Sequence, residues 1–357
     1  MAIGIFSTFL TIGQTYEKNK HISRSFEVTG MTEIQINNKY GTIHVIPWEK
    51  DSVRFEIDLK VKANKESKVD KIYEYIDFEF TSTSYYVIAQ TVFTNKRNSF
   101  WTELSDITNM IFSGGNKAEI DYIVYLPDKN PIKISNKFGN IYCTDHNGKA
   151  EINISNGDIK AHDFTGITNI TLEFGRGNIH SIQSGTLQVN YSEINVEQSE
   201  NLKVSGKSAT INIESINELH LESRRDKVNI GKASKIFGET SFSYTTIDKL
   251  ERNITLKTEY GEIRIESLAE GFRFAGINST YTDIFMTLPA NMGLNLEISH
   301  DDRTDISMPP TFDKIKTESK DPGSGTLITY GSIGEIQRDP SRINITTQSG
   351  HLSFSLK

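Results

Sequence analysis

Asn156-Gly157-Asp158-Ile159 is one copy of a short phrase that recurs along this 357-residue chain. Each copy has a polar or aromatic residue, a small residue, a polar residue and then an apolar residue. Other copies begin at Tyr40, Phe138, Arg176, Tyr191, Ser208, Arg225, Tyr244, Tyr260, Tyr281, Arg303 and Ser349. Between Ile141 and Ile306 the apolar anchors are 15 to 22 residues apart, which is too short for a unit with a crossover helix.

Apolar and polar residues alternate on both sides of each phrase, as in Ile152/Ile154 before one copy and Ile159/Ala161 after it. A period of two is the signature of a half-buried strand. One strand–turn–strand repeat cannot bury its own apolar row, so successive repeats must stack, with equivalent strands paired in parallel. The sequence therefore predicts an all-β, single-stranded β-solenoid similar to a right-handed parallel β-helix. We expect the glycine of the phrase to supply a positive φ at the turn.

The repeats do not fill the chain evenly. We expect solenoid repeats over residues 131–357 and an irregular, β-rich N-terminal part over residues 22–130. Apolar residues with helical spacing predict a short helix from Glu66 to Tyr75 and a helical insertion at 95–117.

An apolar, nearly uncharged run over residues 2–12 opens the chain and ends at small residues. It is too short to span a bilayer and resembles a signal peptide, although no basic region precedes it. We assign residues 1–13 to a signal peptide and expect export to the periplasm, the outer cell surface or the medium. The alternative is a buried first strand. No later segment is a transmembrane candidate.

The net charge is -7 and no basic block occurs, so nucleic acid is not an expected partner. The single cysteine, Cys143, cannot form an intramolecular disulfide. It falls in the apolar column of Val45 and Val196, which predicts a small, buried hydrophobic residue rather than a reactive thiol.

Aromatic residues recur just before the small residue of the phrase. Tyr244, Tyr260 and Tyr281 occupy this position in the later copies, as Tyr40, Phe138 and Tyr191 do in earlier ones. Stacked repeats would align these rings either as a carbohydrate-binding strip or as a purely structural ladder. Phe100 and Trp101 in the helical insertion are a second candidate surface, for a partner or for capping an open end of the stack.

Polar columns suggest two further features. Glu262, Asp283 and Asp305 follow the small residue in late copies, and stacked carboxylates of this kind either form a solvated acidic edge or bind calcium. Calcium is the only cofactor that the residues suggest. Asn195, Asn212 and Asn229 recur at steps of 17, which predicts a ladder of hydrogen-bonded amides.

The densest titratable cluster is His300-Asp301-Asp302-Arg303 with Asp305. Polysaccharide hydrolysis requires two carboxylates on opposite sides of the scissile bond, whereas these residues are adjacent in one turn. No serine elbow, phosphate-binding loop or dinucleotide fingerprint occurs. We therefore assign no catalytic residue.

The stretch Asn37-Asn38-Lys39-Tyr40-Gly41-Thr42-Ile43, followed by Pro47-Trp48, resembles the opening of a bacterial β-strand-repeat family of proposed adhesins that is frequent in Bacteroidetes. Tyr122-Ile123-Val124-Tyr125-Leu126-Pro127 and the block from Ile134 to Ile141 match the next landmarks of that family. The resemblance extends from about Phe26 onward. It implies an exported β-solenoid of unknown biochemical role and supplies no catalytic residues.

Three functions remain open from the sequence. The leading hypothesis is a non-catalytic, exported cell-envelope or secreted interaction protein, adhesin-like, that binds a protein or a glycan. The alternatives are a polysaccharide lyase or hydrolase on a β-helix, and a periplasmic scaffold or sensor in envelope signalling. A groove with converging carboxylates would favour the enzyme, and a surface covered by ladders would favour binding.

Overall fold

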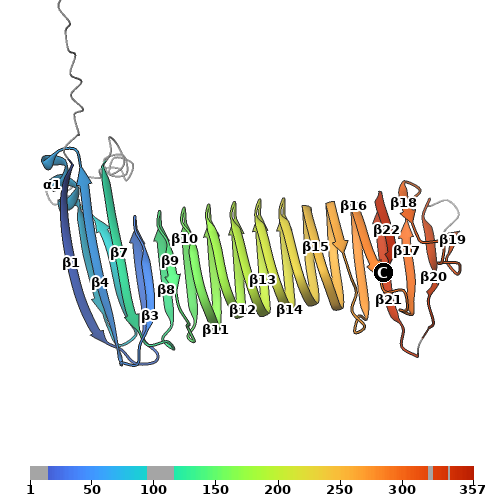
Figure 1. Ribbon diagram of the computed structural model, residues 1–357, viewed down its shortest axis with the longest axis horizontal. Coiled ribbons are helices and arrows are strands. Elements are labelled where there is room, and N and C mark those ends of the chain that lie inside the picture. Colours follow the sequence, from blue (N-terminus) through green and yellow to red (C-terminus); the bar gives the residue numbers. More distant parts are fainter. Residues whose placement is uncertain (1–14, 95–115, 321–324, 337) are drawn as a thin grey trace, which may run out of the picture.

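A computed structural model describes residues 15–94, 116–320, 325–336 and 338–357. The protein is nearly all β, and the strands lie side by side along the long axis of the molecule (Figure 1). The helix among the described residues is α1 (Glu66–Tyr75), which confirms the helix predicted from the apolar spacing. The predicted signal peptide at 1–13 and most of the insertion at 95–117, with Phe100 and Trp101, lie outside the described residues.

The N-terminal strands are β1 (Tyr16–Glu27), β2 (Glu33–Lys39), β3 (Ile43–Pro47), β4 (Ser52–Ala63), β5 (Ile76–Ser82), β6 (Tyr86–Phe93) and β7 (Lys117–Leu126). The central strands are β8 (Ile132–Lys137), β9 (Ile141–Cys143), β10 (Ala150–Ser155), β11 (Ile159–Glu173), β12 (Arg176–Asn190), β13 (Glu193–Lys207), β14 (Thr210–Arg224), β15 (Lys227–Ile265) and β16 (Phe274–Leu288). The last strands are β17 (Leu294–His300), β18 (Thr304–Ser307), β19 (Lys316–Ser319), β20 (Leu327–Ile333), β21 (Ser341–Gln348) and β22 (Gly350–Leu356).

Strands β10 to β16 pair in parallel, each with the equivalent strand of the next repeat. Ile194 pairs with Ile211, and Ile211 pairs with Val228, so identical columns of the repeat lie in register. The predicted parallel stacking of equivalent strands is confirmed. The inward side chains form a single apolar core that runs from the N-terminal strands to the last repeat.

Two copies of the phrase were predicted in the wrong register. Ile159 pairs with Gly177, not with Ile179, so the copy assigned to Arg176 begins two residues earlier, at Phe174. The copy assigned to Tyr244 likewise begins at Phe242. The physical reason is that these two repeats lack the apolar anchor: side-chain atoms of the neighbouring Ile194 lie 2.9 Å from where a Cβ on Gly177 would stand.

The order of the last repeats in space differs from their order in the chain. Strand β21 pairs in parallel with both β16 and β17, and β22 pairs with both β16 and β18. The final repeat is therefore inserted between two earlier ones, which corrects the expectation of consecutive stacking. Strand β20 pairs antiparallel with β17 on one side and with β19 on the other, and β19 is a short and fully exposed strand at this edge. Short polar edges of this kind discourage pairing with other chains.

The N-terminal strands add to both strands of the repeat, the one before the corner and the one after it. Strand β2 lies between β6 and β8, while β3 lies between β7 and β9, all in parallel pairs. Antiparallel strands then cover this end: β4 pairs with β7, and β1 pairs with β4 (Figure 1). Cys143 is buried at the start of the regular repeats, as predicted, and desolvation raises the pKa of its thiol to about 12. Within the described ranges, no helix has the length and apolar character that a bilayer span requires.

The glycine of the phrase is needed for close contact between repeats rather than for its own φ. The positive φ belongs to the preceding residue, for example 58° at Phe138, whereas Gly139 has an ordinary φ. A Cβ on Gly139 would lie 1.8 Å from the carbonyl oxygen of Gly41 in the preceding repeat. The predicted role of glycine is therefore wrong at this copy, although Gly261 and Gly350 do have positive φ values, 157° and 118°.

Replacing this glycine tests the contact. Gly139→Ala should lower the free energy of unfolding by about 1–3 kcal/mol or more, because a methyl group cannot fit against a backbone oxygen without moving one repeat. Gly30→Ala is the matched control, since nothing lies within 4 Å of a Cβ at that position. Chemical denaturation of both variants measures the difference. Equal stability of the two would contradict the close contact.

Burial of a histidine predicts sensitivity to acid. His146 is 1% exposed and packs against the ring of Phe164, and desolvation lowers its pKa from 6.5 to about 4. The unfolded chain then binds the proton more tightly than the folded chain does, so stability is complete above pH 6.5 and is lost as the pH falls through 4. The two pKa values correspond to about 3 kcal/mol.

The prediction is checked by denaturation at neutral pH and near pH 4 for the wild type and for His146→Gln. The wild type should lose about 2–3 kcal/mol more than the variant on acidification. Parallel losses in the two proteins would show that His146 does not sense the pH.

Candidate functional site

One corner of the repeat collects the aromatic residues. The described residues with a positive φ other than glycine are Tyr40, Phe138, Asn156, Phe174, Tyr191, Ser208, Arg225, Phe242, Tyr260, Tyr281 and Ser349, and all stand at this corner. We call this set the corner column. Tyr244, predicted to belong to it, lies two residues further on, and Phe242 takes its place. Bulky residues with positive φ are uncommon, so this recurrence is a specific feature of the fold.

The rings of the corner column stack face to face in two exposed runs. Phe242 and Tyr260 have centroids 4.8 Å apart with ring planes at 7°, and Tyr260 and Tyr281 have centroids 5.1 Å apart at 10°. In the other run, Phe174 and Tyr191 lie 5.2 Å apart at 3°. About half of each side chain is exposed. The structure thus brings Tyr260 and Tyr281 together as predicted, while their role toward a ligand stays a prediction.

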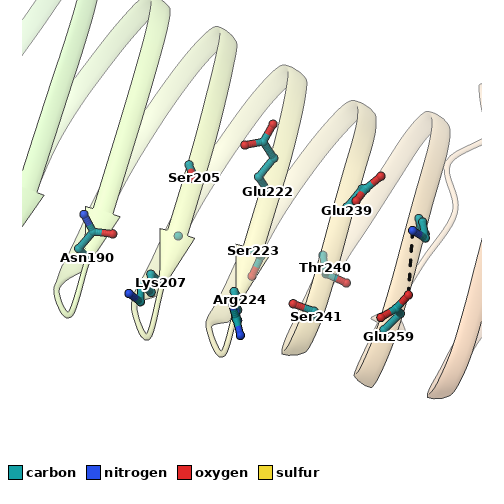
Figure 2. Close-up of a pocket in the computed structure, with 12 residues that line it drawn as sticks. Asn190, Ser205, Lys207, Glu222, Ser223, Arg224, Glu239, Thr240, Ser241 and Glu259 are labelled. Carbon is teal, nitrogen blue, oxygen red and sulfur yellow. Dashed lines mark ion pairs between the residues drawn. The ribbon is translucent and has the colours of Figure 1, made fainter.

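Ser208 and Arg225 separate the two runs, and a groove lies beside this interruption (Figure 2). The groove has a volume of about 580 Å³ and follows the strand residues just before the corner. Its lining is polar and charged, with Asn190, Ser205, Lys207, Glu222, Arg224, Glu239, Ser241, Lys257 and Glu259 among its residues. The Lys207 ammonium lies 5.6 Å from the Tyr191 ring centroid, so a cation lies over the ring at one end of the groove.

The three carboxylates suggested for calcium do not form one group. Glu262 pairs with Asp283 along the stack, but the inserted last repeat places His351 between Asp283 and Asp305. The His351 N–H donates to Asp283 at 2.9 Å, and the imidazole Nδ1 lies 2.9 Å from Asp305. Glu262 accepts a hydrogen bond from Arg264. Each carboxylate therefore has its own partner, and whether a cation binds any of them stays a prediction.

The cluster around His300 is a closed turn. The Asp301 carboxylate accepts hydrogen bonds from Arg303, from the Thr304 hydroxyl and from the Ser349 N–H. Desolvation opposes ionisation of Asp301, yet these hydrogen bonds hold its pKa at about 2. His300 is buried and contacts Thr329 through Nε2. These side chains bind one another and fix the turn that joins β17 to β18.

The amide ladder predicted from the steps of 17 is present and begins one repeat earlier. Asn195 donates to Asn178 at 2.9 Å, Asn212 donates to Asn195 at 2.7 Å, and Asn229 donates to Asn212 at 2.7 Å. The ladder ties successive repeats together through side chains on their outer surface.

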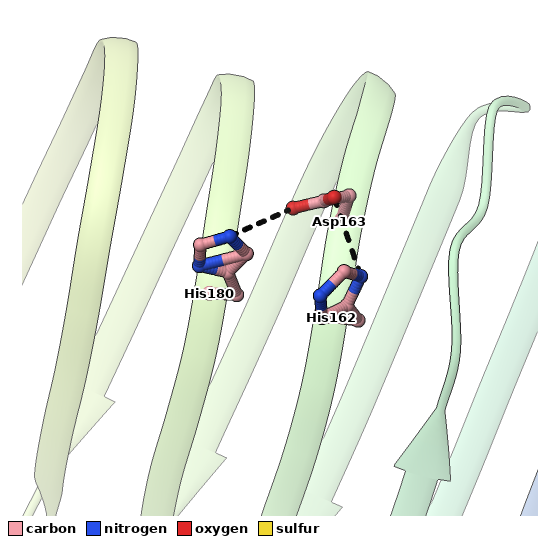
Figure 3. A group of neighbouring side chains, drawn as sticks. All are labelled: His162, Asp163 and His180. Carbon is pink, nitrogen blue, oxygen red and sulfur yellow. Dashed lines mark ion pairs between the residues drawn. The ribbon is translucent and has the colours of Figure 1, made fainter.

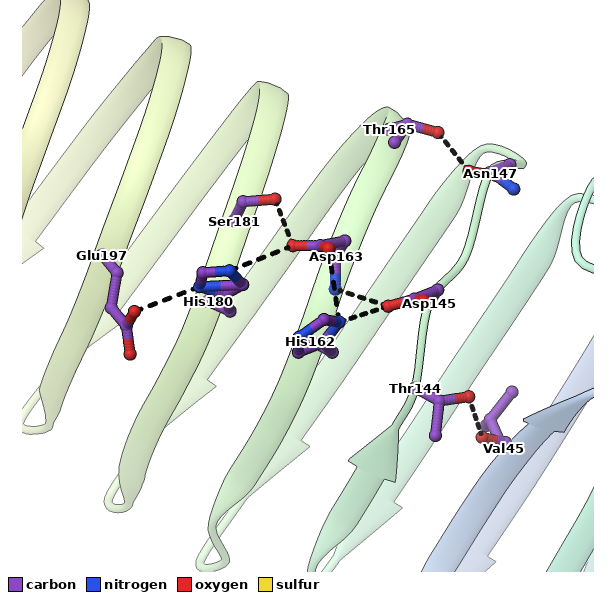
Figure 4. Close-up of polar contacts among 10 residues, drawn as sticks. All are labelled: Val45, Thr144, Asp145, Asn147, His162, Asp163, Thr165, His180, Ser181 and Glu197. Carbon is purple, nitrogen blue, oxygen red and sulfur yellow. Dashed lines mark hydrogen bonds and ion pairs between the residues drawn. The ribbon is translucent and has the colours of Figure 1, made fainter.

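Acidic residues and histidines alternate in a row on the outer surface, two or three residues along the chain from the asparagine ladder. Their order across the repeats is Asp145, His162, Asp163, His180, Glu197 (Figure 4). His162 Nδ1 contacts Asp145 and lies 3.3 Å from Asp163 Oδ2. His180 Nε2 lies 4.0 Å from Asp163 Oδ1, and its Nδ1 lies 3.1 Å from Glu197. The hydrogen bond with Asp145 raises the pKa of His162.

The sequence contained the signal for this row, since His162 and His180 are 18 residues apart, as are Asp145 and Asp163. The misplaced copy at Arg176 hid it. In that register His180 follows its anchor Ile179 directly, whereas His162 stands three residues after Ile159, so the two histidines fell in different columns.

Comparisons with known proteins give structural neighbours only. No family model and no curated protein matches the chain. Solved structures that resemble it include a "putative adhesin" from Parabacteroides merdae ATCC 43184, with 11% identity, covering 74% of this chain and 95% of that one, at a TM-score of 0.37.

Two further neighbours cover nearly the whole of both chains. A "putative adhesin" from Bacteroides fragilis NCTC 9343 shares 12% identity over 94% of this chain and 97% of that one, at a TM-score of 0.28. A "putative cell adhesion protein" from Clostridium sporogenes ATCC 15579 shares 11% identity over 95% and 100%, at a TM-score of 0.20. Their names are of the kind that the resemblance in the sequence implied. At these TM-scores, no function is transferred from them to this chain.

Proposed function

We propose that the protein is an exported, non-catalytic, adhesin-like interaction protein whose repeats form a β-solenoid and bind a cell-surface glycan at the corner groove. The observation that carries the proposal is the recurrence of exposed aromatic residues with positive φ on both sides of that groove. Such residues combine an unfavourable backbone with exposed apolar surface, and strain of this kind clusters at binding sites.

The corner backbone does not require aromatic side chains. The cost of a left-handed backbone, about 1–2 kcal/mol, falls on every L-residue at this position, and Asn156 and Ser208 occupy it without a ring. A stacked ring pair contributes about 0.5–1.5 kcal/mol, so stacking accounts for part of the preference for aromatic residues. The half of each ring that stays exposed is available to a ligand.

The groove has the dimensions and chemistry of an oligosaccharide site. Tyr191 and Phe242 are the rings on either side of the gap at Ser208 and Arg225. Three steps of the stack separate them, which is about 14 Å at 4.8 Å per strand. Tyr191 and Phe242 directly follow the groove-lining residues Asn190 and Ser241, and their exposed rings offer apolar faces for sugar C–H groups. Between them, Lys207, Arg224 and Glu222 offer donors and acceptors for hydroxyl or acidic groups.

The groove is poorly suited to general acid catalysis. A glycosidase needs one carboxylic acid with a raised pKa. In this groove the hydrogen bond from Lys203, with a second contact to His220, lowers the pKa of Glu222. Another lining carboxylate, Glu259, lies 4.0 Å from Lys257 in an ion pair. These pairings favour a binding surface over the polysaccharide-active enzyme.

The proposal is tested on a glycan array with the wild type and two double variants. Tyr191→Asn with Phe242→Asn removes the rings beside the groove, and Tyr260→Asn with Tyr281→Asn removes the predicted strip. Asparagine tolerates a positive φ, so both variants keep the corner that Asn156 already adopts. The first variant should bind its glycan at least tenfold more weakly, a loss of about 1.4 kcal/mol.

Tyr85→Asn serves as the control, because Tyr85 is exposed but lies in the N-terminal part, outside the corner column. Loss of binding in the second double variant as well would extend the site along the column. Retention of binding by both double variants would refute a glycan site at the corner.

A further inference from the structure

The row of acids and histidines described above has no part in the corner groove. His162 and Asp163 lie on β11, and His180 lies on the next repeat in β12 (Figure 3). We propose that His162, Asp163 and His180 form a site for a transition-metal ion of the zinc class. This inference does not depend on the proposed function.

The three side chains are spaced as zinc ligands require. One nitrogen from each histidine and one oxygen of Asp163 all lie within 4.8 Å of one another. In a tetrahedral site with bonds of about 2.0–2.1 Å, neighbouring ligand atoms are roughly 3.3–3.4 Å apart. His162 Nδ1 lies 3.3 Å from Asp163 Oδ2, whereas His180 Nε2 lies 4.0 Å from the other oxygen, Asp163 Oδ1, so the carboxylate must rotate to present one oxygen to an ion held by both imidazoles. Small rotations of exposed side chains close the remaining gap.

The flanking carboxylates complete the arrangement. Zinc-binding histidines usually donate their second ring N–H to a carboxylate, which fixes the tautomer and the ring orientation. His180 directs Nε2 toward Asp163 while its Nδ1 lies 3.1 Å from Glu197, so Glu197 is placed to orient it. Asp145 is hydrogen-bonded to the same nitrogen of His162 that faces Asp163, so a bound ion replaces the proton on this nitrogen and leaves the Asp145 oxygen beside it.

The choice of ligands selects the class of ion. Calcium and magnesium prefer six or more oxygen ligands, whereas two imidazoles and a carboxylate suit zinc and similar transition metals. Three protein ligands leave a fourth position open to water. Because the row is on the outer surface, that position is accessible to a donor group from another molecule.

The ligand set is tested by calorimetric titration of the full, tag-free chain with zinc chloride. The wild type should bind one zinc ion. His180→Gln and Asp163→Asn should each weaken binding at least tenfold, and Glu197→Gln should weaken it about 10–100-fold through loss of orientation. The visible spectrum with cobalt(II) should report a four-coordinate ion in the wild type and not in His180→Gln.

His21→Gln is the matched control, since His21 is as exposed as His162 and lies 2.8 Å from a carboxylate, that of Asp58. It should bind zinc as the wild type does. Melting curves without metal verify that each surface variant is folded. Absence of zinc binding by the wild type, or unchanged affinity in both His180→Gln and Asp163→Asn, would overturn the proposal.

Discussion

The in-register hydrogen bonding of each strand to the same strand one repeat away is the constraint on which the rest of the structure depends. The step between corner residues is 17 or 18 from Phe138 to Tyr260, so each position of the repeat forms a straight column. Most buried columns are therefore apolar, as the column from Val45 through Cys143 to Val196 is. Exposed columns place similar side chains next to one another, so asparagines form hydrogen bonds along one column and aromatic rings stack along another.

The backbone N–H groups that follow the corner residue need hydrogen-bond acceptors, and side chains supply these acceptors in two ways. Where glycine follows the corner residue, a side chain of the preceding repeat accepts the next N–H, as Asn140 does from Asp158 at 2.9 Å. Where a polar residue replaces glycine, its own side chain accepts the N–H of the residue that follows the corner in the preceding repeat. Asp226 does so from Ala209 at 2.8 Å while almost fully buried, and desolvation raises its pKa. Both solutions leave the backbone of the turn hydrogen-bonded.

Sequence reasoning succeeded where period and composition agree and failed where one repeat departs from the pattern. The asparagine ladder, the buried Cys143 and the α1 helix all followed from spacing. The position of Gly177 in the anchor column did not follow from spacing, because Ile194 of the neighbouring repeat fills the space of the missing side chain. No local pattern in the sequence reveals such a contact. That single error of two residues also concealed the pairing of His162 with His180. The corner groove was not foreseen either, since it depends on where Ser208 and Arg225 interrupt the column.

The insertion of the final repeat has a consequence for how the chain reaches its native state. Strands β17 and β18 cannot pair with β16, because residues 341–356 occupy both edges between them. During synthesis the growing stack can therefore extend by simple addition only as far as β16. The antiparallel pair of β17 and β20 has no strand to pair with in the stack until residues 341–356 have been synthesised. Completion of this end therefore joins contacts that are distant in sequence, and such contacts form slowly. A ribosome-bound chain that ends before residue 341 would expose β16 as an open, unpaired edge.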